Sequence, residues 1–111
     1  MAWQAKHRYA RISPRKVNLA AGLIRGRDVQ DALNVLKFTP NRAAGMVAQV
    51  LTSAIANANE AEANVELLVV REVRVDQGPT IKRWREGDRG RAKPILKRTS
   101  HITVAVDQAE A

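Results

Sequence analysis

The chain has 111 residues, a formal net charge of +8 and a pI near 10.9, which points to a polyanionic partner, either a nucleic acid or an anionic membrane surface. It contains no cysteine, which excludes disulfides and thiolate metal sites. No apolar run reaches the roughly eighteen residues of a transmembrane helix, and the length predicts a single domain over residues 1–111.

The positive charge is concentrated at the two ends of the sequence. Residues 1–27 hold seven Lys or Arg and no acid, residues 28–70 hold two against five acids, and residues 71–111 hold ten against six. This distribution predicts a nearly neutral scaffold that presents basic elements. The acid-free start is similar in charge to a transit peptide, but it leads into a structured pattern without a cleavage-like break, so we interpret it as part of the fold.

The first elements predicted are a strand and a helix. Alternation over residues 3–11 predicts a strand with Lys6 and Arg8 on one face. Ser13 and Pro14 predict a helix start, because the hydroxyl can accept from a backbone N–H and proline needs no donor there. Gly26 offers a left-handed stop. The apolar stripe of this helix is Val17, Ala20, Ala21, Leu23 and Ile24.

This first helix opens with two cations, Arg15 and Lys16. Its own dipole disfavours them by a few tenths of a kcal/mol, since the N-terminus of a helix carries partial positive charge. An external anion near that end would remove the conflict. The alternative is that both are ordinary surface cations.

Two further helices are predicted in the middle of the chain. Asp28 is expected to cap the second helix, and Thr39 with Pro40 to start a third that runs to about residue 59, before an acidic connection over 60–66. The expected buried faces are Val29, Ala32, Leu33 and Leu36 in the second, and Ala43, Ala44, Val47, Val50, Leu51, Ala54, Ile55 and Ala58 in the third.

The last third of the chain predicts a β-hairpin. Folding residues 71–106 about Asp88 and Arg89 places Val75 opposite Ile102 and Val73 opposite Val104. In the same register Ile81 faces Leu96 further out. The whole chain therefore predicts an α+β fold: a small three-stranded antiparallel sheet packed with three helices, plus a long protruding β-hairpin.

The outer part of this hairpin, residues 79–98, is too long for its domain. Each side has ten residues, which project roughly 33 Å, whereas a compact domain of this length has a radius of gyration of about 13 Å. Residues 80–101 hold eight Lys or Arg against two acids, so the ribbon repels itself and we expect something anionic to cover it. The alternative is a long surface loop with solvated charges.

The sequence offers no catalytic or metal-binding constellation. His7 and His101 lack ligand neighbours at metal-binding spacing, and we interpret them as satisfied histidines of the sheet. Residues 87–90 lack the spacing and the strand-to-helix setting of a phosphate loop, and Glu86 with Asp88 is too solvated for an acid–base pair. We therefore predict a protein that is not an enzyme and has no metal and no cofactor.

Six segments in order resemble one protein family. The chain is similar to bacterial-type members of family twenty-two of the large ribosomal subunit proteins through residues 13–17, 23–26, 53–58, 75–79, 90–92 and 95–104. The resemblance implies a small body bound to ribosomal RNA and an extended hairpin that lines the polypeptide exit tunnel. The implied partners are large-subunit rRNA, neighbouring ribosomal proteins including large-subunit protein number four at the tunnel, and the nascent polypeptide in passing.

The predicted RNA-binding residues come from this resemblance together with the basic pattern. The family's RNA-contacting helix start and hairpin match Arg15, Lys16, Lys82, Arg83, Arg91, Lys97 and Arg98, and the neighbouring cations Lys6, Arg8, Arg11, Arg25, Arg85 and Lys93 are added to them. The implied tunnel-lining tip is Trp84, Glu86, Gly87, Asp88, Arg89 and Gly90. Here the acids Glu86 and Asp88 depart from the family's usual basic tip. Trp84 is also unusual there and could stack on a base or face the tunnel.

We therefore predict a structural rRNA-binding protein of the large ribosomal subunit, cytoplasmic, and monomeric outside the ribosome. The main alternative is an architectural DNA-binding protein with basic β-arms, which would need a homodimer with an extensive interface between bodies. A membrane-surface module ranks last, because the helices have alanine-rich stripes and few basic residues beyond the first helix.

Overall fold

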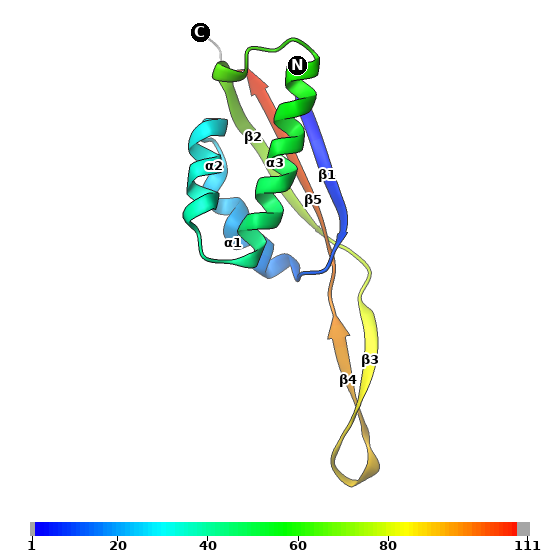
Figure 1. Ribbon diagram of the computed structural model, residues 1–111. Helices are drawn as coiled ribbons and strands as arrows, with labels where there is room; N and C mark the ends of the chain where they lie inside the picture. The colour runs from blue at the N-terminus through cyan, green and yellow to red at the C-terminus, as the bar shows by residue number, and fades with distance from the viewer. Residues whose placement is uncertain (1, 109–111) are drawn as a thin grey trace.

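The computed structural model describes residues 2–108, except for the side chain of Asp88 (Figure 1). Strand β1 (Trp3–Ala10) leads into helices α1 (Pro14–Ile24), α2 (Val29–Phe38) and α3 (Arg42–Glu60). Four strands follow: β2 (Leu68–Gln77), β3 (Ile81–Glu86), β4 (Ala92–Lys97) and β5 (Ser100–Gln108). This α+β architecture confirms the predicted fold class.

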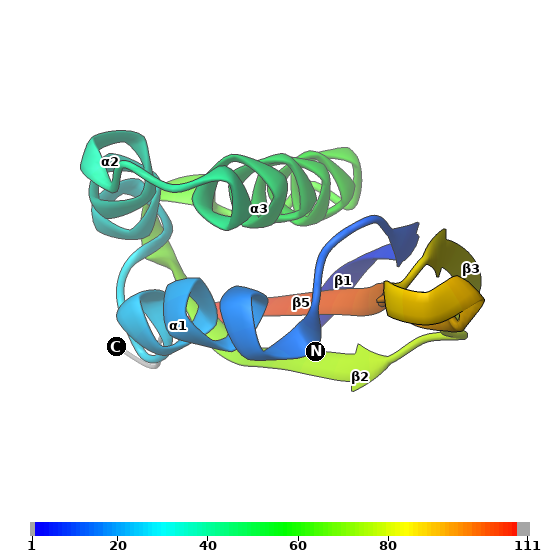
Figure 2. The same ribbon diagram turned by 90° about the horizontal axis from the view of Figure 1, so that it is seen from below.

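The strands form two separate sheets. Strands β1, β5 and β2 make a three-stranded antiparallel sheet with β5 in the centre, and within residues 2–108 β3 pairs only with β4. Helix α3 packs along β1 and β5 and α1 packs beside β2, as Figures 1 and 2 show. We call the three-stranded sheet with its helices the body, and the β3–β4 hairpin the arm.

The arm makes the molecule long and thin. The principal extents are 66 × 25 × 17 Å, and the radius of gyration is 17.0 Å rather than the roughly 13 Å of a compact domain of this length. Figure 1 shows the arm extending from one end of the sheet, away from all three helices. The predicted protrusion is confirmed, and the loop alternative is wrong.

The core lies between the helices and the inner face of the sheet. Nearly all the predicted stripe positions are buried there, because the alanines let α1 and α3 approach the strands closely. Three predicted positions differ. Leu33 and Ile55 are half-buried, and Leu23 is 41% exposed because it lies on the solvent side of α1.

The starts of all three helices are capped differently from what the sequence predicts. Ser13 and Asp28 occupy the N-cap positions of α1 and α2, but neither side chain accepts a capping hydrogen bond. Helix α3 begins two residues after Thr39–Pro40, and the Asn41 side chain caps it by accepting from the Ala44 N–H at 3.2 Å. The Thr39 hydroxyl instead donates to the Val35 carbonyl at 2.7 Å, at the end of α2.

The register of the long hairpin changes where the body meets the arm. Val75 pairs with Ile102 and Val73 with Val104, as predicted. Ile81, however, pairs with Lys97 and not with Leu96, because three residues (78–80) join β2 to β3 while only two (98–99) join β4 to β5. Two hydrogen bonds hold this junction: Gly78 N–H to the Thr99 carbonyl at 2.9 Å, and the Thr99 hydroxyl to the Pro79 carbonyl at 2.6 Å.

The turn at the tip is correspondingly centred on Arg89. The Gly87 N–H donates to the Arg91 carbonyl at 2.7 Å, and Arg89 and Gly90 adopt left-handed φ values of 57° and 72°. Glycine at residue 90 is well suited to this backbone, since a left-handed φ has no steric cost for it. The one-residue shift has a consequence along the arm, because it moves every side chain of one strand relative to the other.

We expect amide hydrogen exchange to separate the arm from the body. In the isolated protein, residues 82–96 should exchange much faster than residues 47–55 of α3, because both edges of a two-stranded ribbon face water while the middle of α3 packs on the core. Mass spectrometry of peptic fragments, without RNA, measures both segments at once. Equal protection in the two segments would contradict this division.

Candidate nucleic-acid interface

Four acids of the body, Asp31, Glu72, Asp76 and Asp107, pair with cations outside the predicted binding set. Arg27 pairs with Asp31 at 2.9 Å, Arg71 with Asp107 at 2.8 Å, and Arg74 with Asp76 at 3.3 Å. Within the described residues, none of the thirteen predicted RNA-binding cations forms an ion pair. The cations that remain available to an external anion therefore include all thirteen residues of the predicted set.

Asp107 illustrates this pairing. Burial raises the pKa of its carboxyl, but the Gln108 N–H at 2.8 Å and the Arg71 guanidinium outweigh that effect, so the pKa lies below its usual value. The carboxylate thus stays charged and holds Arg71 on the body.

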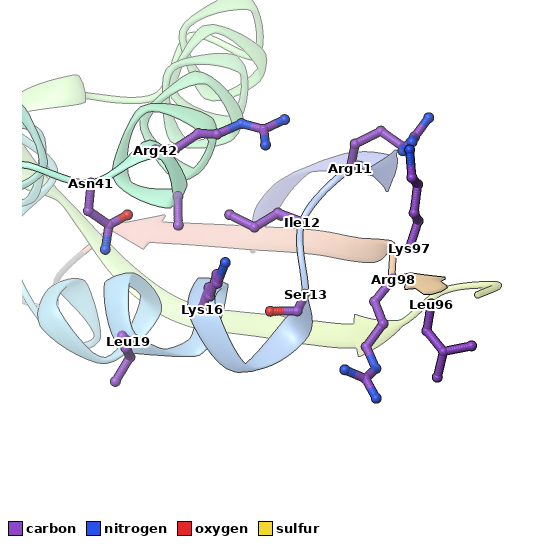
Figure 3. Close-up of a pocket in the computed structure, with 11 residues that line it drawn as sticks. Arg11, Ile12, Ser13, Lys16, Leu19, Asn41, Arg42, Leu96, Lys97 and Arg98 are labelled. Atoms are coloured by element: carbon purple, nitrogen blue, oxygen red, sulfur yellow. The ribbon is translucent and has the colours of Figure 1, made fainter. Parts of the chain in front are cut away.

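Five cations line a cleft of about 860 Å³ at the base of the arm (Figure 3). Four segments meet there: the β1–α1 connection, the start of α1, the start of α3, and the end of β4 with the residue that follows it. The cations lining the cleft are Arg11, Lys16, Arg42, Lys97 and Arg98, and no acid of the described residues lines it. Ser13, Asn41, Ile12, Leu19, Ala43 and Leu96 complete the wall.

The fold brings these segments together through the β1–α1 connection. The Ser100 hydroxyl, fully buried, donates to the Ile12 carbonyl at 2.6 Å and so fixes the connection against β5. Ile12 is buried, which leaves Arg11 and Ser13 on either side of it at the surface of the cleft. A short buried anchor thus positions the cations.

Both helix starts add to the positive potential of the cleft. Neither α1 nor α3 has an acid in its first turn, so the partial positive charge of each N-terminus is not offset there. Lys16 and Arg42 stand at these ends with the same sign of charge. An anion in the cleft would relieve the repulsion, as the sequence predicts for the start of α1.

Arg42 is the cleft residue that the sequence reasoning missed. It is the first residue of α3 and therefore carries the same signal, a cation at an unfavourable helix end, that singled out Arg15 and Lys16. The signal was obscured because the expected start of α3 lay at Thr39–Pro40. With the start placed at Asn41, Arg42 falls in the first turn.

The other predicted cations lie apart from the cleft. Lys6 and Arg8, on the exposed face of β1, line a shallow groove against Gln49, Val50 and Ser53 of α3, with a volume of about 290 Å³. Arg91 and Lys93 line a further hollow, with Arg89, near the tip of the arm. Arg15 is exposed on α1 next to Lys16. Lys82, Arg83 and Arg85 are exposed along β3.

Arg25 has a structural contact of its own. Its Nε and Nη2 atoms donate to the Val73 carbonyl at 3.2 and 2.9 Å, so the side chain ties the end of α1 to the edge strand β2. Two of its five donors are therefore used within the protein.

The described residues include no group of three or more His, Cys, Asp or Glu side chains that could hold a metal ion. His101 accepts the Tyr9 N–H through Nδ1 at 3.1 Å, and its ring meets the Tyr9 ring edge-on at 4.9 Å between centroids. Among the helices that the structure describes, none combines the length and the apolar character that a membrane span requires.

Comparison with known proteins agrees with this geometry. The family model described as ribosomal protein L22p/L17e matches residues 5–107. The chain is 51% identical over 107 residues to a protein of Desulfosudis oleivorans, covering 96% of this chain and 94% of the relative. It is 52% identical over 111 residues to one of Thermoanaerobacter sp. strain X514, covering 99% and 100%.

A third relative, from Rubrobacter xylanophilus, is 53% identical over 108 residues, covering 96% of this chain and 85% of the relative. All three relatives are named large ribosomal subunit protein uL22. The match extends over the body and the arm alike, so it does not depend on the basic composition of one segment. The chain therefore belongs to the ribosomal protein L22p/L17e family, as the resemblance of its sequence predicted, and is a non-enzymatic ribosomal protein.

Proposed function

We propose that the chain is a structural component of the bacterial large ribosomal subunit, in the cytoplasm, and that its body binds and organises rRNA through the basic cleft. The observation that carries the proposal is the cleft itself, where five cations from four segments meet with no acid among the lining residues. Its relatives are named for the large ribosomal subunit, and this supports rRNA as the polyanion that the cleft binds. Family membership also favours RNA over DNA.

The mechanism of binding is electrostatic. Lys and Arg in the cleft and along the arm neutralise phosphates, and the counterions released from the RNA drive association. The backbone and shape of the RNA are recognised rather than its sequence, because the major groove of A-form RNA is too narrow for side chains to read. In this proposal Lys6, Arg8, Arg15, Lys82, Arg83, Arg85, Arg91 and Lys93 extend the contact beyond the cleft.

The arm has a second role in the same proposal. It reaches away from the body and lines the polypeptide exit tunnel, near large-subunit protein number four, with residues 86–90 at its tip closest to the passing chain. The extended shape supports this role, since a molecule 66 Å long from body to arm can reach from the subunit surface into the RNA. Outside the ribosome the protein is a monomer.

The salt dependence of RNA binding tests the proposal. With six to ten phosphate contacts, the plot of log K against log salt should have a slope of about −0.7 to −0.9 per contact. The Lys97→Ala/Arg98→Ala variant should reduce the magnitude of this slope by about 1.4–1.8, because it removes two contacts at the cleft. Filter binding to a large-subunit rRNA fragment between 50 and 300 mM salt measures it.

A matched control variant has the same net charge as Lys97→Ala/Arg98→Ala. Arg27→Ala/Arg74→Ala also removes two cations, but both are already paired with acids of the body, so its slope should stay near that of the parent. If the two variants lose slope equally, the effect is one of net charge, and the cleft is not the binding site.

A further inference from the structure

The two faces of the arm differ in chemistry. Residues directly opposite each other in an antiparallel pair point to the same face, and alternate residues point to opposite faces. The pairs Arg83–Ile95 and Arg85–Lys93 therefore share one face with Ile81 and Lys97. This basic face carries four cations and no acid: Arg83, Arg85, Lys93 and Lys97.

The other face is mainly apolar. It is formed by the pairs Lys82–Leu96, Trp84–Pro94 and Glu86–Ala92. Along β3 the cation Lys82 therefore lies on one side of the indole and the acid Glu86 on the other. We call this set the platform face. The predicted register would have placed Leu96 with Ile81 on the basic face, and only the one-residue shift at the junction moves Leu96 beside Trp84.

The centre of the platform face is the pair Trp84–Pro94. Pairs alternate between hydrogen-bonded and non-hydrogen-bonded types, and counting from the Gly87–Arg91 hydrogen bond makes Trp84–Pro94 a non-hydrogen-bonded pair. Proline has no N–H to lose there, and side chains stand closest in such pairs. The result is an exposed ring surface: Trp84 is 67% exposed and Leu96 is 46% exposed.

The platform face is continuous with the basic cleft. Leu96 belongs to both, since it lines the cleft with Lys97 and Arg98 and pairs with Lys82 next to Trp84. A nucleic-acid backbone that leaves the cleft therefore passes Lys82 and meets the indole within two residues along β3. Beyond Trp84 the carboxylate of Glu86 repels a phosphate, which favours a base rather than the backbone over the ring.

We propose that Trp84 and Pro94 form a stacking platform for an unpaired nucleobase of the RNA whose backbone occupies the cleft. This rests on the proposed function and adds that the arm selects single-stranded or bulged RNA there, because a paired base cannot leave its stack to cover the indole. Base–aromatic stacking tolerates any sequence, since every base has a π-face. A polypeptide is the other conceivable occupant, but the cations of both faces attract a polyanion.

Trp84 can report on its own contact. The chain has two tryptophans, and the other, Trp3, is partly buried against the core. In a Trp3→Phe variant the fluorescence comes from Trp84 alone. We expect a five-nucleotide single-stranded RNA to quench it strongly, and an abasic strand with the same number of phosphates, or a blunt duplex, to quench it little.

Affinity measurements keep the test independent of the Trp3 variant. With fluorescein-labelled RNA, Trp84→Ala should weaken binding of the single strand about tenfold or more and leave binding of the abasic strand unchanged, while Trp84→Phe keeps most of the affinity. Leu67→Ala, another exposed apolar residue but on the body, is the matched control and should change neither.

The outcomes distinguish the platform from the cleft. Equal binding of single-stranded and abasic RNA by the parent, unaffected by Trp84→Ala, overturns the platform and leaves the proposed function standing. Failure to bind either strand also overturns the platform, while the proposed function is decided separately by the salt dependence of binding to the rRNA fragment. Quenching by an uncharged apolar peptide, with none by the single-stranded RNA, would assign the platform to a polypeptide and reject our inference.

Discussion

Alanine replacement of Lys16, Arg42 and Arg98 together is expected to weaken binding of the chain to an rRNA fragment by about a hundredfold or more at 0.1 M salt. These three cations come from α1, α3 and the junction after β4, and all line the same cleft. Each cation replaces counterions condensed on the RNA, so the loss of affinity in the variant should become smaller as the salt concentration rises. Filter binding or fluorescence anisotropy at several salt concentrations measures it.

The control for this variant removes the same charge elsewhere. Arg27→Ala/Lys37→Ala/Arg74→Ala also lowers the net charge by three, but Arg27 and Arg74 are paired with acids and Lys37 lies in the last turn of α2. Its affinity should stay within a few-fold of the parent. Circular dichroism should show both variants folded, because the cleft side chains are at the surface. Comparable losses in the two variants would mean that net charge, and not the cleft, determines binding.

The second large effect concerns stability. Leu51→Ala should lower the free energy of unfolding by about 2–5 kcal/mol, a large part of the roughly 5–15 kcal/mol typical of a domain. Leu51 is fully buried in α3, at the centre of the cluster between helices and sheet, and the tight alanine-rich packing around it leaves the cavity little room to collapse. Urea unfolding followed by circular dichroism gives the value.

Leu67→Ala provides the comparison, since Leu67 is 45% exposed and its loss should cost less than about 1 kcal/mol. The slope of the unfolding free energy against urea should be the same for both variants, so that the shift of the midpoint reports stability. A similar unfolding midpoint for Leu51→Ala and Leu67→Ala would show that Leu51 is not packed in the core as described.

Most of the fold follows from local patterns in the sequence. The period of the apolar residues predicts all three helices and their faces, and the pairing of Val75 with Ile102 and Val73 with Val104 fixes the sheet register. The predicted register of the arm was wrong by one residue, because Ile81 pairs with Lys97 and not with Leu96. Whether two or three residues join the strands at Gly78 is decided by the hydrogen bonds of Gly78 and Thr99, which no periodicity reveals.

The candidate site could be predicted only in part for a related reason. Charge and resemblance predict Arg11, Lys16, Lys97 and Arg98 as RNA-binding residues, but they do not show that these residues share one cleft. That depends on the buried contact of Ser100 with Ile12, between residues 88 positions apart in the sequence. Arg42 was missed because the competing start signal at Thr39 belongs to the end of α2.

The separation of the arm from the body sheet sets a parity rule for changes in the length of the arm. Side chains alternate between the two faces of the arm, so the face on which a residue lies depends on its number of positions from the junction. Removing one residue from each strand therefore moves every side chain beyond the deletion to the opposite face. Trp84 would then stand on the side that Arg83 and Arg85 occupy. Removing or adding two residues per strand changes the reach of the arm and keeps its two surfaces. We therefore expect the hairpin to tolerate changes in length in steps of four residues and to lose its two distinct faces when the length changes by two.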